Sequence, residues 1–281
     1  MKPDTATGLL RASPLDAVDA RVLLTHALGW RRTELITRGD LLLSDAQIAS
    51  FTALEQRRIA GEPIAQITGR REFHGLDFEV TPAVLIPRPE TELLVETVLE
   101  ALADVASPMI LDLGTGSGAI AIAIAAQRHD ARIVATDRSG AALAVAQRNA
   151  QRLLDADRPG GMLEFAEGSW FEALAQMKPR PVFDAIVSNP PYIAAGDPHL
   201  SQGDLRFEPS GALTDDADGL TALRKIATGA RAWLKPEAPL WVEHGYDQAA
   251  QVRAMLVEQG FAMVESRRDL AGIERITGAR S

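Results

Sequence analysis

The sequence predicts an α/β domain with a mainly parallel sheet, preceded by a small helical domain. Three observations lead to this prediction. Beyond residue 88, short apolar segments alternate with helical ones, as strands and their connecting helices do. The first sixty residues show helical periodicity alone. Between these two parts, residues 63–88 hold several prolines and a short stretch of alternating polarity.

Two capped helices are expected in residues 1–62, which we assign to an N-terminal helical domain. Ser13, followed by a proline and an acidic residue, is the expected N-cap of the first helix, and Gly29 ends it. Ser44 and Gln47 have the spacing of a capping box at the start of the second helix.

A β-hairpin is expected within residues 63–88. Residues 72–74 and 77–80 alternate in polarity on either side of a glycine. The prolines that follow interrupt regular structure. We interpret this interval as a hairpin and linker, and residues 89–281 as the α/β domain.

The α/β domain should contain a sheet covered by helices on both faces, because its strands and helices alternate. The expected strands are 109–113, 131–136, 163–166, 183–188 and 240–243. The expected helices are 118–127, 139–154, 219–234 and 249–259, and a closing hairpin is expected at 261–265 and 272–276.

Charge and hydropathy indicate a soluble cytoplasmic protein. No apolar run approaches the roughly 18 residues of a membrane span, and the N-terminus lacks the features of a signal peptide. The formal net charge is −9. Proteins that track a nucleic-acid backbone usually carry a basic surface, so no direct nucleic-acid partner and no membrane partner are expected.

Several kinds of chemistry are excluded or disfavoured. The chain has no cysteine, which rules out disulfides, thiolate nucleophiles and cysteine-based zinc sites. His74, His199 and His244 are isolated, and no residues have metal-ligand spacing, so no metal is expected.

A glycine-rich turn follows the first strand of the α/β domain and opens a helix. It consists of Gly114, Thr115, Gly116, Ser117 and Gly118. In an open α/β sheet, ligands bind at this position, and glycines let the backbone approach them closely. The glycine spacing differs from the dinucleotide fingerprint, and the lysine of a phosphate loop is absent. A glycine turn without a ligand remains the alternative.

Asp137 indicates that the ligand contains a ribose. It ends the next strand, 19 residues beyond Gly118 (137 − 118), where a carboxylate can accept hydrogen bonds from ribose hydroxyls. The alternative role is a helix N-cap, which Ser139 can fill instead.

The sequence Asn189-Pro190-Pro191-Tyr192 follows a strand and is the candidate acceptor site. The prolines end regular structure, so the Asn189 carboxamide is left at the carboxyl end of the strand. A rigid turn without catalytic function is the alternative. The carboxamide oxygen and the Pro190 carbonyl can accept both N–H bonds of a planar amide or amine. They would thereby aim its nitrogen at the methyl group of a sulfonium, which requires mostly orientation.

Together these motifs resemble class I methyltransferases, and more closely the HemK-type release-factor glutamine methyltransferases of bacteria. The resemblance extends over essentially the whole chain. It includes the glycine turn, Asp137, the Asn-Pro-Pro-Tyr motif, and residues 69–73, 86–92 and 269–272.

The resemblance implies a Rossmann-like seven-stranded sheet and the cofactor S-adenosyl-L-methionine. It implies that the acceptor is the glutamine of the Gly-Gly-Gln motif of peptide chain release factors, methylated at N5. It also places Arg88 near the methionine carboxylate of the cofactor and Trp170 near its adenine. Ser169 stands where the family often has Asp or Asn.

Two other functions are considered. Enzymes that methylate adenine N6 or guanine N2 of nucleic acids use the same acceptor motif, but they must extrude a base, and no basic, aromatic-rich region is present for this. A non-catalytic scaffold would show a damaged acceptor motif, whereas this one is intact. Since all the motifs that carry chemistry lie after residue 85, the helical domain is expected to recognise the protein substrate.

Overall fold

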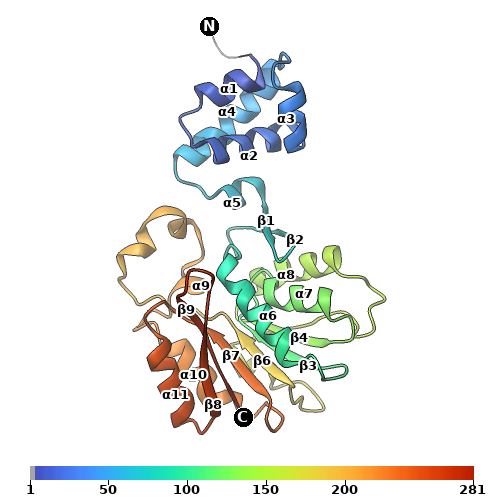
Figure 1. Cartoon of the computed structure of the whole chain (residues 1–281), viewed down its shortest axis with the longest axis vertical. Helices are drawn as coiled ribbons and strands as arrows, with labels where there is room; N and C mark the ends of the chain where they lie inside the picture. Colours follow the sequence, from blue (N-terminus) through green and yellow to red (C-terminus); the bar gives the residue numbers. More distant parts are fainter. Residues whose placement is uncertain (1–3) are drawn as a thin grey trace. The chain divides into compact units, whose positions relative to one another are not determined.

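A computed structural model describes residues 4–281 of the chain. Its contacts divide into two compact units, one extending to Arg70 and the other comprising Arg71–Ser281. We call them the helical unit and the sheet unit (Figure 1).

The helical unit packs short helices around a small apolar core. Its helices are α1 (Ala6–Ala12), α2 (Ala17–Leu28), α3 (Arg32–Arg38), α4 (Asp45–Ile59) and α5 (Ile64–Thr68). Leu23 and Leu24 of α2 and Phe51 of α4 are buried at its centre.

The capping residues are partly as expected. The capping box of Ser44 and Gln47 is present, and Gly29 ends α2 in the left-handed conformation at φ 64°. The assignment of Ser13 as N-cap is wrong: the carboxylate of Asp16 accepts two N–H groups of the first turn of α2, whereas Ser13 ends α1. Periodicity also missed α1 and α3, which are only seven residues long.

The expected hairpin is present as β1 (Arg70–Phe73) and β2 (Leu76–Glu79). Phe73 and Phe78 are buried in the core of the sheet unit. The Asn149 carboxamide accepts the N–H of Glu79 at 2.7 Å and donates to its carbonyl at 3.0 Å. The division between the two units falls within residues 63–88.

The sheet unit is built on seven strands in the order β5-β4-β3-β6-β7-β9-β8. They are β3 (Met109–Leu113), β4 (Arg132–Asp137), β5 (Glu164–Glu167), β6 (Ala185–Ser188), β7 (Pro239–Glu243), β8 (Ala262–Arg268) and β9 (Glu274–Arg280). The first five are parallel, and β9 lies antiparallel between β7 and β8. This arrangement confirms the predicted seven-stranded methyltransferase fold.

Helices cover both faces of the sheet (Figure 1). The α-helices of this unit are α6 (Glu92–Ala101), α7 (Ala119–Gln127), α8 (Gly140–Leu153), α9 (Ser210–Leu213), α10 (Thr221–Ala230) and α11 (Ala249–Glu258). Alternate strand residues point to opposite faces, so Ile110 packs with α6 and α7, while Leu111 packs with α10 and α11. Within residues 4–281, no helix has the length and apolar composition needed to cross a membrane.

The strand order creates a crevice at one point of the sheet. β3 pairs with β4 on one side and with β6 on the other, so the chain leaves β3 in one direction and later returns on its opposite side. The connections then diverge above the carboxyl ends of these strands, which is where open α/β sheets bind ligands.

Candidate active site

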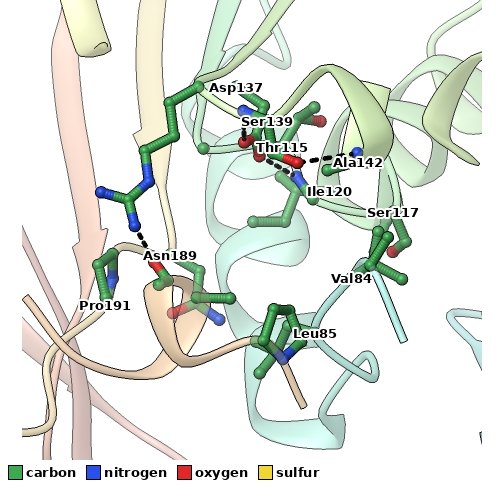
Figure 2. A pocket seen from close by; sticks show the side chains of 18 of the residues that line it. Val84, Leu85, Thr115, Ser117, Ile120, Asp137, Ser139, Ala142, Asn189 and Pro191 are labelled. Carbon is green, nitrogen blue, oxygen red and sulfur yellow. Dashed lines mark hydrogen bonds between the residues drawn. The ribbon is translucent and has the colours of Figure 1, made fainter. Parts of the chain in front are cut away.

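A pocket of about 320 Å³ opens at this crevice, entirely within the sheet unit (Figure 2). Residues that follow β3, β4, β5 and β6 form its floor, and two further segments, 83–91 and 209–212, complete its walls. Asp137, Ser139 and Thr115 lie on one side of the view, and Asn189 and Pro191 on the other.

The glycine-rich turn between β3 and α7 requires its glycines. Gly114, Gly116 and Gly118 all have positive φ, between 56° and 84°. A Cβ on Gly118 would lie 2.7 Å from the Ile122 side chain and 3.2 Å from Ala146, so α7 and α8 could not pack as closely. The turn therefore lets a ligand approach the backbone at Gly114 and Gly116 closely, because no side chain projects from it there.

Asp112 anchors this turn from beneath. It is fully buried at the end of β3, and its carboxylate accepts the Thr115 hydroxyl at 2.7 Å. Burial raises the pKa of Asp112 to about 7, although the Thr115 hydrogen bond opposes this rise. The side chain holds the turn in shape from below.

Asp137 points its carboxylate toward the same turn. One oxygen accepts the Gly116 N–H and the other the Ser139 N–H, each at 2.9 Å. Ser139 is the N-cap of α8, because its hydroxyl accepts the N–H of Ala142. Asp137 is therefore not needed as the cap of this helix. Each carboxylate oxygen has a further lone pair, so Asp137 can still accept hydroxyl groups of a ligand.

Trp170 follows β5 and lies beside the glycine turn. Its ring is 3.6 Å from the position a Cβ on Gly114 would occupy, and its backbone is in the left-handed region at φ 51°. Ser169 precedes it in the pocket wall. Trp170 also lines the pocket.

Asn189 follows β6 and is held by a chain of hydrogen bonds. Its Nδ2 group donates to the Thr91 hydroxyl at 3.1 Å, which donates to the Glu243 carboxylate at 2.7 Å. The Tyr192 hydroxyl donates to the other oxygen of the same carboxylate at 3.2 Å. Asn189 and Tyr192 of the acceptor motif are thus tied to one acidic side chain.

Burial dominates the ionisation of this chain. It raises the pKa of Glu243 to about 7, against the effect of the hydrogen bonds from Thr91 and Tyr192. Burial, together with the Glu243 charge, raises the pKa of Tyr192 far above its ordinary value, so this phenol stays neutral.

Arg88 joins two walls of the pocket. Its guanidinium is paired with Glu208, whose other oxygen accepts the N–H of Ile86 at 2.8 Å. The Glu208 side chain is fully buried, and this burial raises its pKa while Arg88 lowers it. Since a guanidinium has five N–H donors, Arg88 can hold Glu208 and a ligand carboxylate at the same time.

Residues 194–219 form a long segment with glycines and prolines, of the kind that often covers a binding site, and they are built of short helical turns. They hold Pro198–Ser201, Gly203–Phe207 and α9. Bonds from the N–H of Ile193 to Leu213 and from that of Ala195 to Ala217 close the base of the segment. Pro209, Gly211 and Ala212 line the pocket, and residues between about 196 and 207 form the protruding loop beside α9 in Figure 1.

We expect residues 196–213 to be the part that responds to ligands. Hydrogen exchange of this segment should slow when cofactor and acceptor protein are added together, because contacts with both would suppress local opening. Exchange in β8, the edge strand separated from β6 by β7 and β9, serves as the control. Unchanged exchange in 196–213 with both ligands present would rule out a covering role.

Most of the residues predicted from the sequence come together in this pocket. Lining residues among them are Gly114, Thr115, Gly116, Ser117, Asp137, Trp170, Asn189, Pro191 and Arg88. Gly118, Pro190 and Tyr192 lie outside the lining: Gly118 begins α7, and Tyr192 turns to Glu243. Across residues 4–281, no three His, Asp or Glu side chains are grouped to hold a metal.

Sequence reasoning missed Thr91, Glu208 and Glu243. A signal existed for Glu243, which ends a buried strand as Asp137 does. Thr91 lies within segment 86–92, which carries part of the resemblance to the family but does not by itself mark Thr91 as a site residue. No local signal marks Glu208, whose role depends on a contact 120 residues away along the chain.

Comparison with known proteins identifies the family. The chain is 63% identical over 278 residues to the release factor glutamine methyltransferase of Burkholderia pseudomallei, covering 99% of this chain and 96% of that one. The chain belongs to the release factor glutamine methyltransferase family. The Bordetella pertussis member is 52% identical, over 96% of this chain and 97% of that one.

Other comparisons agree with this family and with the fold. The family model described as the PrmC N-terminal domain matches residues 4–69, and the methyltransferase small domain matches residues 89–204. A methyltransferase structure from Pyrococcus furiosus aligns with a TM-score of 0.54 at 18% identity, covering 82% of this chain and 98% of that one. That likeness shows the fold alone.

Proposed function

We propose that this enzyme transfers a methyl group from S-adenosylmethionine to the side-chain amide nitrogen, N5, of the glutamine in the Gly-Gly-Gln motif of peptide chain release factors. The observation that carries this proposal is the Asn189 carboxamide, held at the pocket wall opposite Asp137 and the glycine turn. Family membership supports a protein glutamine over a nucleic-acid amine as the acceptor.

The pocket has groups for each part of the cofactor. Asp137 would accept the ribose hydroxyls, Trp170 would pack on the adenine, and Arg88 would hold the methionine carboxylate. At Gly114 and Gly116 the ligand could lie close to the backbone, because no side chain intervenes there.

The acceptor amide needs orientation more than a base. The Asn189 oxygen and the Pro190 carbonyl would accept its two N–H bonds and direct the nitrogen lone pair out of conjugation, toward the methyl group. When bound, the cofactor supplies its methyl group as a sulfonium, which becomes a neutral thioether as the acceptor nitrogen gains the methyl group and loses one proton to solvent. Pro191 lines the pocket wall, and Tyr192, which remains neutral, is bonded to Glu243.

Mass spectrometry of an unmethylated release factor tests this function. Incubation with the enzyme and S-adenosylmethionine should add one methyl group to the tryptic peptide that holds Gly-Gly-Gln. Its mass should increase by about 14 Da. A release factor with this glutamine changed to alanine is the control. Modification of RNA in place of the release factor would support the nucleic-acid alternative.

Translation termination on bacterial ribosomes takes place in the cytoplasm, so we place the enzyme in that compartment.

The helical unit is proposed to recognise the release factor. The residues that line the pocket lie between 83 and 212, within the sheet unit. This unit also leaves apolar side chains in solvent, among them Ile36 at 85% and Leu42 at 76% exposure. Such side chains are suited to contact a protein partner.

Deletion of residues 1–70 should separate recognition from chemistry. The cut is set at Arg71 because Phe73 and Phe78 belong to the core of the sheet unit. We expect cofactor affinity and activity on a Gly-Gly-Gln peptide to persist, while kcat/KM on intact release factor falls about 10- to 100-fold as remote binding energy is lost.

Steady-state kinetics on both substrates measure this difference. Equal kcat/KM on intact release factor with and without residues 1–70 would refute the recognition role. Aggregation of the shortened protein would instead show that the helical unit covers an apolar face.

A further inference from the structure

Neighbouring side chains determine which way the Asn189 carboxamide is turned. A carboxamide can rotate by half a turn and exchange its donor and acceptor ends, with nearly the same shape. In this pocket Nδ2 faces the Thr91 hydroxyl at 3.1 Å. Thr91 has 4% exposure and comes just before α6, so solvent does not compete for that contact.

Counting protons explains which end faces Thr91. A hydroxyl has one proton, and Thr91 donates it to the Glu243 carboxylate at 2.7 Å. The Thr91 oxygen can then only accept from Asn189, so Nδ2 must face it. An ionised Glu243 also accepts from Tyr192 at 3.2 Å, which occupies its second oxygen.

We infer that Thr91 and Glu243 are positioning residues for methyl transfer, which keep the Asn189 carboxamide turned so that its oxygen remains free to accept the N–H of the acceptor amide. The inference rests on the proposed function of Asn189. Reversal of the carboxamide would present two N–H donors to an acceptor that itself carries N–H donors. The hydrogen bond on which orientation depends would then be lost.

The chain of hydrogen bonds also strengthens Asn189 as an acceptor. Hydrogen bonds in series polarise one another, so donation from Nδ2 toward a carboxylate increases the negative charge on the Asn189 oxygen. The acceptor nitrogen becomes positive as the methyl group arrives, and the more negative oxygen stabilises it.

Protonation of Glu243 would reverse this arrangement. A protonated Glu243 can donate to Thr91, whose own proton would then point to Asn189 and favour the flipped carboxamide. Burial places the pKa of Glu243 at about 7; Glu90 raises it and Arg275 lowers it, while Tyr192 stays neutral. Activity should therefore increase with pH across about 6 to 8.

Thr91→Val tests the relay by removing the hydroxyl while preserving the shape. We expect kcat on release factor to fall about 10- to 100-fold, as for loss of a buried hydrogen-bond partner. Cofactor Kd should stay within about threefold, and Thr91→Ser should restore most of kcat because it restores the hydroxyl. Thr97→Val is the matched control, since Thr97 is equally buried in α6 but faces Arg267.

A double variant distinguishes positioning from general stability. If Thr91 acts through Asn189, adding Thr91→Val to Asn189→Ala should change kcat by no more than about threefold, because the two effects overlap. A structural role would instead lower kcat in both backgrounds by the same factor.

Glu243→Gln gives an independent readout if Thr91→Val fails to fold. Its kcat should be lower than that of the unchanged enzyme at pH 8 and should no longer rise between pH 6 and 8. Asp112 titrates in the same range, so the difference between the two profiles is the measurement.

The possible outcomes are distinct. Full kcat in Thr91→Val, or a pH profile unaltered by Glu243→Gln, would overturn the inference even when the unchanged enzyme methylates release factor. Absence of methylation by the unchanged enzyme would instead refute the proposed function. A lower kcat rescued by Thr91→Ser, with the control Thr97→Val unaffected, supports the positioning role.

Discussion

Replacing Asn189 with alanine is expected to slow methyl transfer about 100- to 1,000-fold, the range measured when a preorganised hydrogen-bonding group is removed from a reacting centre. The carboxamide follows β6 at the wall of the pocket, where the acceptor amide must be oriented. Without it, the amide remains conjugated and free to rotate, so fewer encounters have the geometry for reaction.

The loss should appear in kcat and leave cofactor affinity unchanged, since the interaction is made mainly with the acceptor. Single-turnover rates with saturating cofactor measure the chemical step, and calorimetry of the same variant provides the control. Near-normal turnover would contradict the orientation mechanism. A matching loss of cofactor affinity would assign Asn189 to cofactor binding.

Asp137→Ala is expected to weaken cofactor binding about 100- to 10,000-fold. Two charge-assisted hydrogen bonds to ribose hydroxyls would be lost, each worth roughly 1.5–3 kcal/mol. The alanine also releases the N–H groups of Gly116 and Ser139, which the carboxylate holds at 2.9 Å, so the glycine turn loses support. Both effects act in the same direction on Kd.

Asp130→Ala is the matched control for this prediction. Asp130 precedes β4 at its opposite end, where it pairs with Arg128 and accepts the Ser107 N–H. Those bonds lower the pKa of Asp130 to about 2, so it stabilises the fold above about pH 4, and its loss should reduce stability. Cofactor Kd should stay near normal in Asp130→Ala, and an unchanged Kd in Asp137→Ala would exclude the ribose role.

Much of the sheet unit could be predicted from local pattern. The strand 109–113 matches β3 residue for residue, because a short apolar segment before a glycine turn has few alternatives. Helix starts were predicted less well where two capping residues compete, as Ser13 and Asp16 do before α2. Asp16 is the N-cap because its carboxylate accepts two N–H groups of the first turn of α2.

The residues that follow strands were predictable as a site for a physical reason. Parallel strands bring their carboxyl ends to one edge of the sheet, so Gly114, Asp137 and Asn189 must lie near one another once the strands pair. The sequence alone therefore determined the fold class, the glycine turn, the candidate ribose acid and the acceptor motif.

Only the tertiary structure decided which side chains support these groups. Thr91 and Glu243 are 152 residues apart, and Arg88 and Glu208 are 120 apart, yet each pair is in direct contact. Which residues meet across such distances depends on strand order and on how segments fold over the sheet, and periodicity within a window of some fifteen residues does not encode either. The orientation of Asn189 follows from one of these contacts, because a carboxamide's two ends are distinguished only by the groups that surround them in the folded chain.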